Sequence, residues 1–137
     1  LGDVYKRQTY LNYVPDDVCL IADPEQLYRV INNIISNSIK YNNKARGVIN
    51  IRVREEKEYI HLEIEDNGQG VSPEEAGRIF ERFYRTDASR NSRTGGSGIG
   101  LSIVKKIVEA HGGTIWAVSN KNVGLTMHIL LRKEAHA

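Results

Sequence analysis

Two asparagines in this chain have the type and spacing to hold a metal ion. Asn33 and Asn37 lie four residues apart, and Tyr41 follows after four more. In a helix this spacing places the three side chains along one face. An asparagine carbonyl oxygen is a hard ligand that suits Mg²⁺, which takes one or two protein oxygens together with phosphates and water. The same pattern also fits a solvated polar face, so alone it leaves both interpretations open.

A second group is the run DNGQG at residues 66–70, which directly follows an alternating apolar stretch. A carboxylate at the end of a strand can accept a hydrogen bond from an exocyclic amine. Adenine presents a donor at its six position, whereas guanine presents an acceptor there, so Asp66 would favour adenine. Gly68 and Gly70 would let the backbone approach a flat ligand closely. A simple tight turn is the alternative, because Asp, Asn and Gly are strong turn formers.

A third group is the run GGSGIG at residues 95–100, which opens a periodic apolar segment. A glycine-rich loop that leads into a helix offers free N–H groups and the positive end of the helix dipole to an anion. No Gly-Lys-Ser/Thr follows, so this is not a P-loop. No parallel βαβ unit surrounds it, which argues against a dinucleotide-binding fingerprint. A flexible linker is the bland alternative.

Arginines and histidines complete the candidates. Arginines between residues 78 and 93 could clamp phosphates, bind DNA or only face solvent. They are Arg78, Arg82, Arg85, Arg90 and Arg93. The four histidines are isolated along the chain, at His61, His111, His128 and His136. Since no two of them have metal-ligand spacing, the sequence argues against a zinc site.

Hydrophobic periodicity predicts the elements that position these residues. Helices are expected over residues 23–40, 72–80 and 99–111. Strands are expected over residues 9–14, 18–22, 48–54, 59–65, 114–119 and 124–131. Residues 84–97 lack core periodicity and are interpreted as a functional lid. The order predicts an α+β fold, with helices layered on one face of a mainly antiparallel sheet.

Composition excludes several classes of protein. The 137 residues suffice for one domain, and the formal net charge of +2 gives no footprint for nucleic acid. Cys19 is the single cysteine, so an intrachain disulfide is impossible. No apolar run approaches the roughly 20 residues of a membrane helix.

Taken together, the motifs resemble one family. QLYRVINNIISNSIKY, which contains Asn33 and Asn37, looks like the N box of sensor histidine kinases. The runs at residues 66–70, 79–85 and 95–113 resemble their first glycine box, F box and second glycine box, and GLT at residues 124–126 resembles the closing element. The resemblance covers about residues 9–132 and implies the Bergerat fold, a two-layer α/β sandwich with a mixed, mainly antiparallel sheet.

The resemblance implies a role for each matching position. Asp66 would bind the adenine amine, Gly68 and Gly70 would leave room for the base, and Thr126 would support the adenine pocket. Asn37 would bind Mg²⁺, which bridges the triphosphate of ATP. The residues expected to support phosphates or the nucleotide are Asn33, Lys40 and Tyr41.

In the second glycine box, backbone N–H groups would bind phosphate. The nucleotide-binding residues implied there are Gly96, Ser97, Gly98, Ile99, Gly100 and Leu101. Arg82 or Arg85 would stabilise charge on the transferred phosphoryl group, and Asn33 would assist the transfer step. The implied partners are a dimerisation domain that carries the phosphoacceptor histidine, and a response regulator. The isolated domain would be monomeric and cytoplasmic, without direct membrane contact, in a parent that is anchored to a membrane.

Two departures from the family pattern concern the start of the chain. No helical hairpin with a phosphoacceptor histidine is present, and LGDVYKRQ stands where a first strand and long helix should be. We therefore expect residues 1–8 to be a non-native junction, residues 9–132 to be an N-terminally truncated catalytic domain, and residues 133–137 to be a tail. Exposed apolar surface and poor solubility would follow.

Two other functions remain open at this stage. A degenerate kinase could hold nucleotide without transferring phosphate, although Asn37, Asp66 and the lid glycines are intact. A DNA-linked ATPase of the gyrase or MutL type shares the fold but lacks this F box. Three outcomes would distinguish these functions. Phosphotransfer to an added hairpin domain would indicate an active kinase, nucleotide binding alone a degenerate kinase, and DNA-stimulated hydrolysis a DNA-linked ATPase.

Overall fold

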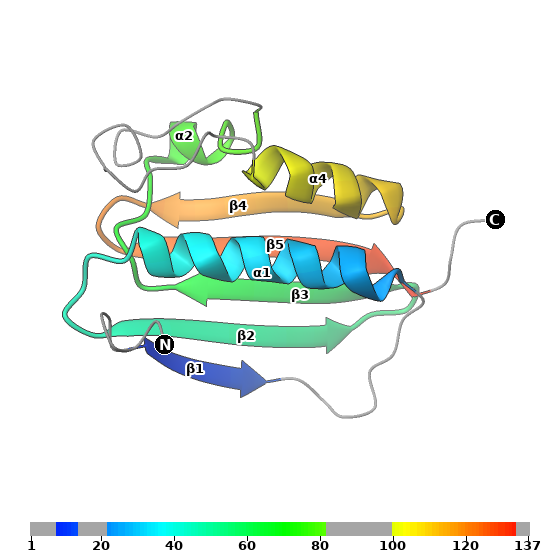
Figure 1. Ribbon diagram of the computed structural model, residues 1–137, viewed down its shortest axis with the longest axis horizontal. Coiled ribbons are helices and arrows are strands. Elements are labelled where there is room, and N and C mark those ends of the chain that lie inside the picture. The colour runs from blue at the N-terminus through cyan, green and yellow to red at the C-terminus, as the bar shows by residue number, and fades with distance from the viewer. Residues whose placement is uncertain (1–7, 14–21, 82–99, 134–137) are drawn as a thin grey trace.

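The computed structural model describes residues 8–13, 22–81 and 100–133, which form one five-stranded sheet with helices against it (Figure 1). The strands are β1 (Gln8–Tyr13), β2 (Gly47–Glu55), β3 (Tyr59–Asp66), β4 (Thr114–Asn120) and β5 (Gly124–Arg132). Their spatial order is β1-β2-β3-β5-β4. β1 runs parallel to β2, and all other neighbours are antiparallel. The predicted α+β fold with a mixed, mainly antiparallel sheet is confirmed.

The long helix α1 (Pro24–Lys40) begins and ends close to where its sequence signals place it. The Asp23 side chain accepts hydrogen bonds from the backbone N–H groups of Glu25 and Gln26, and Pro24 occupies the first turn. The N–H of Tyr41 closes the last turn on the Asn37 carbonyl. Both ends are therefore fixed locally, which sets the position of every residue on the helix.

The core lies between the sheet and the two longer helices. Figure 1 shows α1 and α4 (Gly100–Ala110) side by side on the same face of the sheet. Residues of β3 alternate, so that Ile60, Leu62 and Ile64 all point towards that core. The helices contribute buried residues at helical spacing, namely Val30, Ile34, Val104 and Val108. The apolar periodicity of the sequence thus matches the buried face of each element.

Three details differ from expectation or extend it. β1 begins at Gln8, the last residue of the segment expected to be a junction, and Gln8 pairs with Gly47. α2 (Pro73–Ala76) is a single turn that ends at Gly77, whereas a helix to residue 80 was predicted. The predicted strand at 18–22 and the predicted lid at 84–97 fall almost wholly outside the described residues. Within the described ranges, no helix is long and apolar enough to cross a membrane.

Candidate functional site

Several segments that are distant in sequence meet at one end of the sheet. The C-terminal end of α1, the end of β3 and the turn between β4 and β5 lie together there (Figure 1). The backbone N–H of Gln69 donates to the carbonyl of Tyr41 over 3.4 Å, which ties the DNGQG run to the end of α1. The structure therefore brings the first two candidate groups, the asparagine helix and the DNGQG run, into one place.

Asp66 is the buried acid of this site, with 9% of its surface exposed. Its Oδ1 accepts the backbone N–H of Gly68 at 2.8 Å. Burial raises the pKa of the Asp66 carboxyl, while hydrogen bonds from Gly68, the Ser38 side chain and the Leu125 backbone partly offset that rise. A buried, oriented carboxylate is a strong acceptor for an amine donor, as the adenine interpretation requires.

The two glycines of the DNGQG run, Gly68 and Gly70, have different structural roles. A Cβ on Gly68 would lie 3.0 Å from Oδ1 of Asp66 and 3.3 Å from the Tyr41 carbonyl oxygen. Gly70 has a φ of +61°, and a Cβ there would lie 2.3 Å from the carbonyl oxygen of Asn120. Gly70 is thus required by its own backbone and by the close turn between β4 and β5. The predicted role of Gly70 in leaving room for a base stays a prediction.

Asn67 anchors the run to the start of β2. Its Oδ1 accepts the Val48 backbone N–H at 2.8 Å and the Asn42 side-chain amide at 3.0 Å. Its Nδ2 donates to the Arg46 carbonyl at 3.0 Å. These bonds hold the end of β3 independently of any ligand, and the sequence alone gave Asn67 no such role.

The predicted magnesium and phosphate residues lie on α1 from its middle to its C-terminal end. Asn33 and Asn37 are both half-buried on the helix, one turn apart and therefore on one face. Lys40 is exposed, and its ammonium lies 5.8 Å from the centre of the Tyr41 ring. Asn37 immediately precedes Ser38, the residue that bonds to Asp66. Two hard amide oxygens next to a buried carboxylate site fit the requirements of Mg²⁺ bound together with phosphates.

Thr126 does not share a face with Asp66. The register pairs Asp66 with Leu125 and Glu65 with Thr126. Since neighbours along a strand point to opposite faces, the Thr126 side chain lies beside Glu65 on the face away from the helices. There both residues line a hollow of about 350 Å³. The register puts Leu125 opposite Asp66, and Asp66 lines the same hollow as Thr126, so the support of the adenine pocket by Thr126 stays a prediction.

The remaining predicted residues divide between described and undescribed parts of the chain. Gly100 and Leu101 form the first turn of α4, and a Cβ on Gly100 would meet nothing within 4 Å. The predictions for the other residues lie outside the described residues, namely those for Arg82, Arg85, Gly96, Ser97, Gly98 and Ile99. Among the other arginines, Arg78 forms an ion pair with Glu81 at 3.2 Å on the surface.

Comparison with known proteins decides the family. Residues 22–135 match the model of the histidine kinase-, DNA gyrase B- and HSP90-like ATPases. The chain belongs to this family. The match includes the asparagine helix, the DNGQG run and the second glycine box, so the resemblance drawn from those motifs is confirmed.

Individual relatives of this ATPase domain are sensor kinases. It is 38% identical over 124 residues to the sensor histidine kinase WalK of Bacillus subtilis, covering 89% of this chain and 20% of WalK. It is 36% identical to the signal transduction histidine-protein kinase BaeS of Escherichia coli, covering 88% of this chain and 26% of BaeS. The mycobacterial sensor histidine kinase MprB superimposes with a TM-score of 0.79 at 28% identity, covering 94% of this chain and 86% of that one. The ATPase domain thus spans about a fifth to a quarter of the two curated relatives.

One expectation about the ATPase domain is wrong. The histidines were judged isolated, but β3 and β5 place His61 Nε2 only 3.1 Å from His128 Nδ1. The two residues are 67 positions apart, so their proximity depends on strand pairing that sequence spacing does not show. This pair lies on the sheet face away from the helices and is separate from the Asp66 site.

Proposed function

We propose that this domain binds Mg-ATP and transfers the γ-phosphate to a histidine on a separate dimerisation domain, from which a response regulator receives it. The observation that supports this most is the Asp66 carboxylate, buried at the end of β3 and oriented by the Gly68 N–H. A donor such as the adenine amine would complete its hydrogen bonding. A phosphate group would be repelled by the buried negative charge.

The asparagine face of α1 supplies the second part of the site. Asn37 would hold the magnesium ion, and Asn33, one turn earlier, would contact the phosphates or the ion's waters. When bound, the ion neutralises charge on the triphosphate during transfer. Lys40 and Tyr41 at the helix end would contact phosphate and nucleotide. The protein's task in phosphoryl transfer is positioning and charge stabilisation, which these side chains can provide.

Residues of the second glycine box complete the proposal. The N-terminus of α4, beginning at Gly100, would direct N–H groups towards phosphate, with the preceding residues from Gly96 onwards forming the rest of the box. Arg82 or Arg85 would stabilise the moving phosphoryl group. The attacking histidine, and the base that activates it, would come from the dimerisation domain.

The decisive experiment adds a hairpin domain from a related kinase, magnesium and γ-labelled ATP to this domain. We expect acid-labile label on the hairpin histidine, strong reduction in Asn37→Ala and Asp66→Ala, and no reduction in Asn43→Ala. Asn43 is an exposed asparagine just beyond the helix and serves as the matched control. Nucleotide binding without label, where a control kinase succeeds, would indicate a non-transferring nucleotide module. DNA-stimulated hydrolysis would indicate a gyrase-type ATPase.

A further inference from the structure

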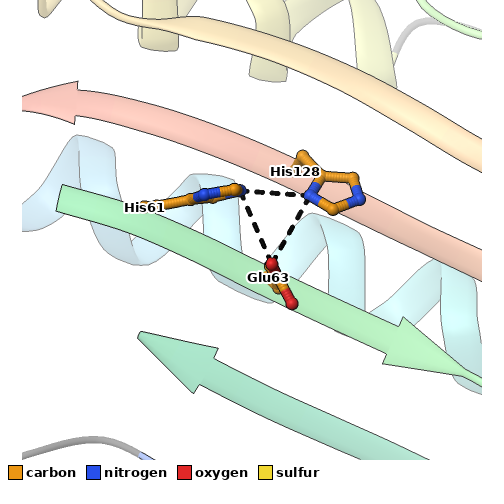
Figure 2. A group of neighbouring side chains, drawn as sticks. All are labelled: His61, Glu63 and His128. Carbon is orange, nitrogen blue, oxygen red and sulfur yellow. Dashed lines mark hydrogen bonds and ion pairs between the residues drawn. The ribbon is translucent and has the colours of Figure 1, made fainter. Parts of the chain in front are cut away.

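Three potential metal ligands meet on the sheet face away from the helices. His61 and Glu63 project from β3, and His128 projects from the neighbouring strand β5, directly opposite Glu63 in the register. Figure 2 shows the three side chains pointing towards one another, with α1 behind the strands. The Asp66 site does not use any of them, so the cluster requires its own explanation.

The spacing of the ligand atoms matches a bound ion. His61 Nε2 lies 3.1 Å from His128 Nδ1, and Oε1 of Glu63 lies 3.7 Å and 3.8 Å from these two nitrogens. The point equidistant from the three atoms is therefore about 2.1 Å from each, close to the Zn–N and Zn–O distances of roughly 2.0–2.2 Å. We propose that His61, Glu63 and His128 form a site for a divalent transition-metal ion, with Zn²⁺ the best match to this ligand set.

The surroundings hold these ligands in place. His61 and Glu63 are 8% and 7% exposed. Arg52 Nε donates to Oε2 of Glu63 at 2.9 Å, which orients the carboxylate and leaves Oε1 directed at the histidines. The Trp116 ring stacks on His128, with centroids 5.0 Å apart and planes 5° from parallel. Partners of this kind around the ligands fix their rotamers, as second-shell groups do in known metal sites.

Arg54 competes with the ion in the metal-free protein. Its Nη2 lies 2.9 Å from Oε1 of Glu63 and 3.0 Å from Nδ1 of His61. Because a guanidinium only donates, His61 must carry its proton on Nε2 and donate it to His128. Metal binding requires Nε2 to be free, so the proton moves to Nδ1, where Glu56 Oε1 at 3.5 Å can accept it. Arg54 has a side chain 62% exposed and can swing into solvent.

The charges that face the cluster permit a cation once Arg54 has moved. Arg52 is offset by Glu63 and by Glu65, whose Oε1 lies 3.3 Å from Arg52 Nη1. Glu56 adds one further negative charge beside His61. If the three side chains only formed a hydrogen-bonded structural network, they would bind no ion. Measuring the affinity for Zn²⁺ therefore distinguishes a metal site from such a network.

The test titrates ZnCl₂ into untagged, nucleotide-free protein by calorimetry, and CoCl₂ while recording Trp fluorescence. Trp116 is the only tryptophan of the chain and touches the site, so Co²⁺ binding should quench it. We expect 1:1 binding and an increase of the melting temperature with Zn²⁺. His61→Gln and His128→Gln should each weaken binding about tenfold or more. Glu63→Gln, which keeps the side-chain shape, tests the third ligand.

Two further variants make the test specific. His111→Gln removes a histidine at the end of α4 that binds the backbone of Asp23 and Ile107, and it should leave Zn²⁺ affinity unchanged. Arg54→Met removes the competitor and should tighten binding by about tenfold, the worth of one charge-assisted hydrogen bond. No Zn²⁺ binding at millimolar concentration, equal affinity in the folded His61→Gln, Glu63→Gln and His128→Gln variants, or no tightening in Arg54→Met would overturn the proposal.

Discussion

Ser38, on the buried face of α1, forms a hydrogen bond to the carboxylate of Asp66 at the end of β3. Ser38 is 7% exposed and Asp66 is 9% exposed, so the bond lies within the packed interface between helix and sheet. It links the helix that carries Asn33 and Asn37 to the acid proposed to bind adenine. A small polar residue at this position therefore couples the two halves of the site.

Replacing Ser38 with Ala should weaken ATP binding. The carboxylate loses one of its donors and part of the restraint on its rotamer, and its pKa should rise further. The expected loss is about 1–2 kcal/mol, the scale of one hydrogen bond to a charged group. Calorimetric titration with a non-hydrolysable ATP analogue measures it. Ser36→Ala, on the exposed face of the same helix, is the control and should bind as wild type; equal affinity of both variants would contradict the coupling.

The raised pKa of Asp66 predicts a distinctive effect of pH on stability. Burial raises the folded-state pKa above its ordinary value of 3.8, so between the two values the folded state binds the proton more tightly than the unfolded state. The free energy of unfolding contributed by Asp66 therefore falls as pH rises through this window and stays low above it. Asp66→Asn has no such titration. Urea unfolding at a series of pH values measures this effect. The free energy of unfolding of the variant should increase relative to that of wild type as pH rises, and the difference should then level off.

The Asp66→Asn substitution should affect stability and ATP binding in different directions. At neutral pH the Asp66→Asn variant should be at least as stable as wild type without nucleotide, yet bind ATP more weakly by about 1–3 kcal/mol. A stability difference that stays flat or falls with rising pH would show that Asp66 is ionised in the folded state without cost.

Local patterns predicted most of the fold. The cap at Asp23, the alternation in β3 and the glycines after α4 are local signals, and each element they define is present. The parallel pairing of β1 with β2 was missed, because Gln8 and Gly47 are far apart in sequence and no local pattern encodes their register. The single turn of α2 was predicted too long, since Ser72 and Pro73 mark a start but Gly77 ends the helix early.

The residues of the candidate site also divide into those marked by local sequence patterns and those brought together only by the fold. Asp66, Asn33 and Asn37 could be proposed from the sequence because each motif is contiguous or helical in spacing. Ser38 and Leu125 were missed because only packing and register bring them to Asp66. The histidine pair was missed for the same reason, as β3 and β5 meet across 67 residues. Sequence reasoning therefore identifies the chemistry on one element better than the chemistry shared between elements.

The left-handed backbone of Gly70 predicts a large penalty for any side chain. At a φ of +61°, Gly70→Ala adds strain of about 1–2 kcal/mol, and its Cβ would lie 2.3 Å from the Asn120 carbonyl oxygen, so the turn must also shift. We expect a loss of at least about 2 kcal/mol in the free energy of unfolding, measured in urea. Gly77→Ala is the control, because Gly77 has a φ of −75° and nothing closer than 3.7 Å to the added carbon. A Gly70→Ala loss no greater than that of Gly77→Ala would show that the turn accommodates a side chain.

Asn67 should prove to be a stability residue. Asn67→Ala removes the acceptor of the part-buried Val48 N–H, which is left unpaired, and the donor to the exposed Arg46 carbonyl, which water can replace. The expected cost is about 1–3 kcal/mol in the free energy of unfolding, with no change in the ATP dissociation constant measured on the folded protein. A weaker affinity for ATP at unchanged stability would contradict this prediction, because it would indicate that Asn67 contacts the nucleotide. Hydrogen exchange of the Val48 amide gives a second measurement, since protection at that single group should fall in the variant if Asn67 is its partner.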